Sequence, residues 1–144
     1  MKTLLKILSV IVIVIIIIVI YLYFKLPSME PTTRLIELNS QTLNEKLYIK
    51  NVIRGITGDH NTILISTTPD IDPFEDSSDD YIFKGWSPFY YKFTDDSLIV
   101  YTMKESIVPT NFNTNIKIVQ VALPNPDMIQ FNDQYEKLGF IKLR

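Results

Sequence analysis

The chain has 144 residues, of which 47% are hydrophobic, and its formal net charge is −2. This length allows one ordinary folded domain, and the absence of cysteine excludes disulfides, thiolate metal sites and cysteine nucleophiles. From Leu26 onward the chain has 11 bases and 16 acids, a net charge of −5. An acidic domain repels phosphate backbones, so we expect no nucleic-acid partner.

The N-terminal segment, residues 1–25, is predicted to be a transmembrane helix. Ile7 to Phe24 are 18 residues without a charge, and residues 11–20 are all isoleucine or valine. At about 1.5 Å per residue they give roughly 27 Å of helix, against a hydrocarbon core of about 30 Å. Lipid favours a helix over the strand that β-branched residues prefer in water, because a helix satisfies its own backbone hydrogen bonds. We therefore expect residues 7–24 to contact the lipid bilayer.

The residues around this span predict an uncleaved signal anchor. A cleaved signal peptide is the alternative, but its apolar stretch is about 7 to 15 residues long and ends in a small-x-small site, and no such site follows Tyr21. Lys2 and Lys6 precede the span, whereas Lys25 alone follows it closely. This bias favours a single-pass membrane protein of a bacterial envelope, with the N-terminus in the cytoplasm and the C-terminal domain extracytoplasmic.

Residues 26–33, which contain two prolines, are predicted to be a short linker, and residues 34–144 a mainly β extracytoplasmic domain. Apolar and polar residues alternate along much of this domain, which is typical of half-buried strands. The predicted strands are 35–38, 47–54, 62–66, 81–84, 89–94, 98–103, 116–123 and 140–143. Two pairs of them, 47–54 with 62–66 and 89–94 with 98–103, are joined by short polar turns and predict β-hairpins.

One helix is predicted near the C-terminus. Asn125 is a good N-cap, Pro126 suits the first helical position, and Asp127 favours the positive end of the helix dipole. Gly139 is the expected stop. An apolar stripe at helical spacing comprises Met128, Phe131, Tyr135 and Leu138. The predicted fold class is therefore a single N-terminal transmembrane helix followed by a small, mainly antiparallel α+β domain with one C-terminal helix packed on its sheet.

The most conspicuous candidate site is the acidic segment 70–80, which holds six of the 16 acids and no base. Closely spaced carboxylates are the ligands that Ca²⁺ prefers, and the candidate metal ligands are Asp70, Asp72, Glu75 and Asp76. The EF-hand pattern is not met, because Phe74 stands where an oxygen ligand is required. Charge runs are typical of solvated loops. We therefore favour a connecting loop, and keep a Ca²⁺-dependent binding module as an alternative; no other cofactor is expected.

The segment from Tyr81 to Phe93 holds seven of the 17 aromatic residues. Clustered aromatic rings can form a platform for sugars or peptides, but they can equally form a core. Strand alternation assigns most of these rings to one buried face, namely Phe83, Phe89, Tyr91 and Phe93. The candidate binding residues are then Trp86, displayed on a Gly-Trp-Ser-Pro turn, and Tyr90, which points to the opposite face.

His60 is the only histidine, and its Gly-Asp-His-Asn context is typical of a turn. The enzymatic alternative is a small hydrolase that uses His60 with a carboxylate of segment 70–80, although no G-x-S-x-G or comparable nucleophile context is present. The leading hypothesis is a non-enzymatic binding or interaction module, tethered to the membrane through residues 7–24, with an envelope protein as its partner. A tether raises the effective concentration of such a module near the membrane.

Overall fold

The computed structural model describes residues 2–25, 31–55, 60–74, 76–85 and 88–143. The first element, α1 (Lys2–Lys25), is a continuous helix. Its described large hydrophobic side chains between Ile7 and Phe24 are 48% to 80% exposed. In the described part of the chain, this helix alone is long and apolar enough to cross a membrane. The predicted N-terminal apolar helix is confirmed, whereas its location in a membrane and its orientation stay predictions.

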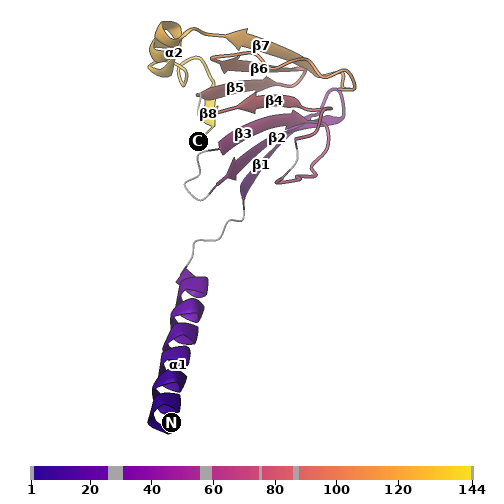
Figure 1. The fold of residues 1–144 in the computed structure, drawn as a ribbon. Coiled ribbons are helices and arrows are strands. Elements are labelled where there is room, and N and C mark those ends of the chain that lie inside the picture. Colours follow the sequence, from indigo (N-terminus) through magenta and orange to yellow (C-terminus); the bar gives the residue numbers. More distant parts are fainter. Residues whose placement is uncertain (1, 26–30, 56–59, 75, 86–87, 144) are drawn as a thin grey trace.

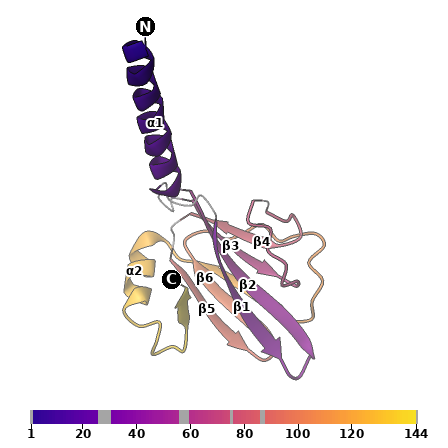
Figure 2. The same cartoon turned by 90° about the horizontal axis from the view of Figure 1, so that it is seen from below.

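Two four-stranded sheets follow α1 (Figures 1 and 2). Sheet A has the order β1–β2–β3–β4 and consists of β1 (Thr32–Ser40), β2 (Glu45–Arg54), β3 (His60–Ser66) and β4 (Tyr81–Lys84). Sheet B has the order β7–β6–β5–β8 and consists of β5 (Phe89–Thr94), β6 (Ser97–Thr102), β7 (Lys117–Ala122) and β8 (Ile141–Leu143). Both predicted hairpins, β2–β3 and β5–β6, are confirmed by antiparallel pairing.

The first strand is longer than the sequence pattern predicts. β1 pairs with β2 from Thr32 to Ser40, so Thr32 and Thr33, which we assigned to the linker, belong to the sheet. Pairing along the whole length of β2 extends β1 into a segment that has little alternation of its own. Of the remaining linker residues, Pro31 is described and belongs to no helix or strand, and residues 26–30 lie outside the described residues.

Sheet B differs from the prediction in one pair of strands. β6 and β7 are parallel, because residues 103–116, here called the crossover, carry the chain back to the end of the sheet where β6 began. Sheet B is therefore a mixed sheet. The sequence pattern predicted a single sheet, whereas the described domain has two. The α+β class and the mainly antiparallel pairing are confirmed.

Sheets A and B share the main hydrophobic core. Sheet A contributes Leu47, Ile49, Ile63, Ile65, Tyr81 and Phe83, among others, and sheet B contributes Phe89, Tyr91, Leu98 and Val100. Three of the four aromatic residues that alternation assigned to this core are members of it, and the fourth, Phe93, packs against it. Each large apolar side chain that is fully buried stabilises the fold by about 1.5–3 kcal/mol, so this core holds the two sheets together.

The C-terminal helix, α2 (Asn125–Asn132), packs on the other face of sheet B, as both views show (Figures 1 and 2). It begins one residue earlier than predicted, because Pro124 and not Asn125 is the N-cap. It is also shorter than predicted, since residues 133–139 form turns. The Phe140 N–H bonds to the Tyr135 carbonyl at 2.9 Å, and Gly139 has a φ of 77°. Glycine accepts this left-handed conformation easily, so it ends the segment as expected.

Candidate functional site

The acidic segment lies within the β3–β4 connection, residues 67–80, here called the acidic loop. Lys50 and Arg54 are four residues apart on β2 and therefore point to the same face of sheet A. The pairing of Lys84 with Thr62 places Lys84 on that face too. This is the face away from the main core, and all three bases form ion pairs with acids of the loop.

Asp76 is the centre of these contacts. Its Oδ1 accepts a hydrogen bond from Arg54 Nη2 at 3.0 Å, and its Oδ2 lies 2.9 Å from Lys84 Nζ. Arg54 Nε also donates to the Pro73 carbonyl at 2.5 Å. Burial raises the pKa of Asp76, but hydrogen bonds from Lys84 and Arg54 and their positive charges lower it by more, so its pKa lies below the ordinary value of 3.8. Asp76 is therefore a carboxylate whose charge is balanced within the protein.

A second ion pair is buried. Lys50 is only 3% exposed and Asp80 only 7%, and Lys50 Nζ lies 3.6 Å from Asp80 Oδ2. Lys50 Nζ also donates to Ser66 Oγ at 2.9 Å. A buried ammonium group is tolerated only when such partners replace its lost water. This pair therefore fixes the end of the acidic loop to sheet A.

These contacts change the interpretation of the predicted cation ligands. Asp76 is occupied by bases, and Asp72 Oδ1 accepts the Phe74 N–H at 2.8 Å. Asp70 is exposed, and Glu75 lies outside the described residues. Within those residues, no three His, Asp or Glu side chains are close enough together to hold a metal ion. The described side chains thus give the Ca²⁺ hypothesis no support, and it stays a prediction.

Tyr90 lies in a core and not on the surface. Its side chain is 0% exposed, and its ring packs edge-on against Phe131 of α2, with centroids 5.1 Å apart. Its hydroxyl donates to Asn132 Oδ1 at 2.6 Å. Alternation gave the correct face for Tyr90, but α2 covers that face, so the ring is not accessible to a ligand here. Trp86, the other candidate binding residue, lies outside the described residues, and its predicted role is untested.

His60 is exposed at the first position of β3, where it pairs with Arg54 across the sheet. In the described ranges, no hydrogen bond joins His60 to a carboxylate or a hydroxyl group. A catalytic histidine requires such a partner, at about 3 Å, to orient it or to receive its proton. The hydrolase alternative therefore has no geometric support from these residues.

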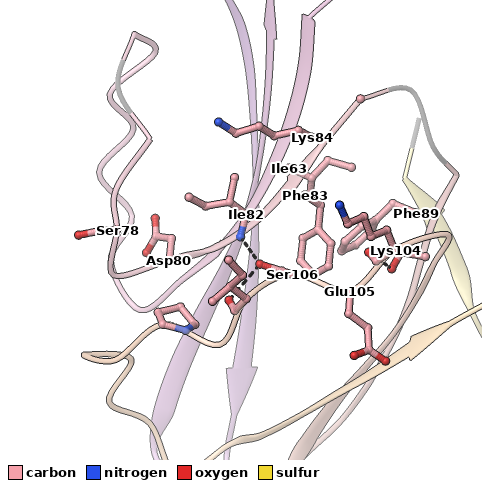
Figure 3. Close-up of a pocket in the computed structure, with 14 residues that line it drawn as sticks. Ile63, Ser78, Asp80, Ile82, Phe83, Lys84, Phe89, Lys104, Glu105 and Ser106 are labelled. Carbon is pink, nitrogen blue, oxygen red and sulfur yellow. Dashed lines mark hydrogen bonds between the residues drawn. The ribbon is translucent and has the colours of Figure 1, made fainter.

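A groove of about 520 Å³ lies between β4 and the crossover (Figure 3). Its volume is within the range of about 300–1,000 Å³ that is usual for ligand sites. The apolar lining comprises Ile63, Ile82, Phe83, Phe89, Ile107 and Pro109. We did not predict this groove, because its walls come from segments far apart in the sequence. The one available signal was the apolar pair Ile107-Val108 in a segment without helix or strand periodicity.

Hydrogen bonds hold the near end of the crossover beside β4. The Ile82 N–H donates to Ser106 Oγ at 2.8 Å, as Figure 3 shows. The Gln120 side chain of β7 binds both backbone groups of Ser106: its Oε1 accepts the N–H at 2.8 Å, and its Nε2 donates to the carbonyl at 3.1 Å. One wall of the groove is therefore fixed to both sheets.

The far end of the crossover is held by Glu45, at the start of β2. The Glu45 carboxylate accepts hydrogen bonds from Thr114 Oγ1 at 2.6 Å and from the Asn115 N–H at 2.8 Å. The bond from Thr114, followed by those from Asn115, lowers the pKa of Glu45 below its ordinary value. Between these anchors, Asn111 Nδ2 donates to Asp79 Oδ1 at 3.1 Å, which joins the crossover to the acidic loop.

The crossover presents apolar and charged side chains at the rim of the groove. Ile107, which lines the groove, is 89% exposed, and the next residue in the chain, Val108, is 64% exposed. Lys104 and Glu105 form no ion pair with another described residue. Figure 3 shows that they point in different directions, Lys104 toward Phe83 and Glu105 away from it. The rim therefore carries one unpaired positive charge directed toward Phe83 and one unpaired negative charge directed away from it.

Known proteins provide no independent indication of function. Comparison of the chain with protein-family models, with curated proteins and with solved structures gives no match. The groove and its rim are therefore the functional evidence that the molecule itself supplies.

Proposed function

We propose that the protein is a membrane-tethered, extracytoplasmic binding module that holds an envelope protein in the groove between β4 and the crossover. The observation that carries the proposal is this groove, with the exposed Ile107 in its lining and the exposed Val108 next to Ile107 in the chain. Exposed apolar surface beside a concave site marks a place where a partner can bury it.

The tether supports the choice of an envelope partner. The apolar span Ile7–Phe24 precedes the domain, and residues 26–31 extend at most about 20 Å at roughly 3.3 Å per residue. A domain on so short a tether meets partners at the membrane at a high effective concentration, so moderate affinity is sufficient.

The fixed wall of the groove supports binding. Ser106 is held by Ile82 and Gln120, and the far end of the crossover by Glu45. A preformed site loses little conformational entropy when a partner binds. No described His, Cys, Asp or Glu cluster suited to a metal accompanies it, and the chemistry that the lining favours is apolar contact.

The proposal is tested by photocrosslinking from the groove in the native membrane. A benzophenone amino acid replaces Ile107 in the full chain, and a matched control carries it at Ile129, an isoleucine of α2 that is 62% exposed. We expect a discrete protein adduct from position 107 and not from position 129. The absence of an adduct from 107, or identical adducts from both positions, would contradict the proposed function.

Orientation has a separate test. Protease added to spheroplasts should remove the domain and leave α1 protected by the bilayer, because Lys2 and Lys6 favour a cytoplasmic N-terminus. Protection of the domain until the membrane is dissolved would place it in the cytoplasm instead.

A further inference from the structure

The edge of β4 presents backbone hydrogen-bonding groups to the groove. The Gly85 N–H donates to the Asn61 carbonyl at 2.8 Å, so residues 81, 83 and 85 bond to β3. In an antiparallel ladder, the N–H and C=O groups of alternate residues point in opposite directions. The backbone groups of Ile82 and Lys84 therefore point away from β3, and both residues line the groove.

These edge groups have different partners. The Ile82 N–H is bound by Ser106 Oγ, a side-chain hydroxyl that takes the position of a neighbouring strand's carbonyl. Among the described residues, neither the N–H nor the C=O of Lys84 has a hydrogen-bond partner. Donor and acceptor on one residue of a sheet edge form the template on which another strand adds.

We infer that the partner enters the groove as an extended segment that adds to the edge of β4 and pairs with the N–H and C=O of Lys84. This inference rests on the proposed function and specifies its binding mode. An extended peptide on a sheet edge gains affinity from backbone hydrogen bonds and specificity from pockets for alternate side chains. Ile82, Ile107 and Pro109, which line the groove and are not buried, supply apolar surface for those side chains.

The rim charge further defines the partner segment. Lys104 points toward Phe83 (Figure 3) and forms no ion pair with a described residue. By contrast, the other lysine of the groove, Lys84, is paired with Asp76 at 2.9 Å. An apolar segment that carries an acidic residue or a C-terminal carboxylate complements this arrangement, because the acid would meet an unpaired ammonium group at the groove.

The test compares two substitutions of one residue in the full chain, in its native membrane, with the crosslinker at position 107. Lys84→Pro and Lys84→Ala both remove the ammonium group, but only Lys84→Pro removes the N–H that points into the groove. Proline is tolerated at such an edge position because the lost N–H does not bond to β3. We expect the adduct yield of Lys84→Pro to fall about tenfold below that of Lys84→Ala, as the loss of one shielded hydrogen bond predicts.

The remaining outcomes are separable. Equal adduct yields in the two variants would overturn strand addition and leave the proposed function standing. Loss of the adduct already in Lys84→Ala would assign the contact to the lysine side chain, and it too would overturn strand addition. An adduct with lipid in place of protein, or no adduct in the unsubstituted chain, overturns both proposals.

The thermal melting curve of Lys84→Pro shows whether this variant folds. If it does not fold, a second variant tests strand addition instead. Ser106→Ala frees the Ile82 N–H for an incoming carbonyl. We expect its adduct yield to rise a few-fold above that of the unsubstituted chain, and an unchanged or lower yield would overturn the inference.

Discussion

The two long connections of the domain, the acidic loop and the crossover, use their charged residues in opposite ways. In the acidic loop, Asp76 and Asp80 are bound by bases that project from sheet A. In the crossover, Lys104 and Glu105 form no ion pair within the described ranges, and the adjacent apolar residues are exposed. A segment rich in charged residues is therefore not necessarily available to a ligand. Its charges are available only where the fold places no residue of opposite charge beside them.

The largest expected effect on stability is in the acidic loop. Asp80→Asn should lower the free energy of unfolding by about 3–5 kcal/mol, because it leaves the Lys50 ammonium group buried without its counter-ion. Urea unfolding of the full chain in detergent, followed by circular dichroism, measures this. The double variant Lys50→Met with Asp80→Leu should recover most of the loss, since an apolar pair needs no counter-ion.

The matched control for Asp80 is Asp70→Asn, at an exposed acid of the same loop. Its free energy of unfolding should change by less than about 0.5 kcal/mol. If the two single variants are destabilised equally, the loop is not held by the buried pair.

Lowering the pH should reduce the free energy of unfolding by a smaller amount than Asp80→Asn does. The folded-state pKa values of Asp76 and Glu45 are lowered, so their stabilising contribution is present above the unfolded values and is lost as the pH falls through the folded ones. The unfolding free energy should therefore decrease as the pH falls below 4.5 for Glu45 and 3.8 for Asp76. Asp76→Asn should cost about 1–2 kcal/mol at neutral pH and flatten the curve at low pH.

Urea midpoints at neutral and acidic pH measure this dependence for the unsubstituted chain, for Asp76→Asn and for Asp70→Asn. We expect Asp70→Asn to keep the full dependence. A pH dependence in Asp76→Asn as steep as that of the unsubstituted chain would show that Asp76 contributes nothing to it.

In contrast to the acidic loop, a substitution in the crossover should weaken partner binding and leave the stability of the domain nearly unchanged. Ile107→Ser should change the free energy of unfolding by less than about 0.5 kcal/mol, because the side chain is 89% exposed. The yield of a partner adduct from a crosslinker at Val108 should nevertheless fall several-fold. A large loss of stability would instead identify Ile107 as part of the core and weaken the contrast between the two connections.

The smallest expected effect is that of calcium. About 5 mM CaCl₂ should shift the thermal unfolding midpoint of the full chain by less than about 1 °C, since a ligand stabilises the native state only when it binds there. The bases on Asp76 and Asp80 already occupy the carboxylates that a cation would need. A rise of several degrees with Ca²⁺ but not with Mg²⁺ would restore the cation hypothesis.

Local sequence patterns predicted the existence and type of the helices and strands, although the bounds of β1 and α2 differ from the prediction. The run of isoleucine and valine predicts α1, and alternation predicts β4 and β5 with the bounds that the structure has. Alternation also placed Phe83 and Phe89 on the core face, because the pleat of a strand directs successive side chains to opposite sides whatever the partner strand is. These features depend on residues close in sequence, so they could be predicted without knowledge of the tertiary contacts.

The faces that are covered and the charges that are balanced could not be predicted from local patterns, because they depend on contacts between distant segments. Tyr90 is buried because α2, more than thirty residues later, packs on its face of sheet B. The acidic loop is balanced by Lys50 and Arg54 because β2 pairs with β3, which the loop follows. The groove exists because the parallel β6–β7 pair sends the crossover past β4. Each of these contacts joins residues far apart in the chain, and a local pattern carries no information on which distant segment its surface will meet.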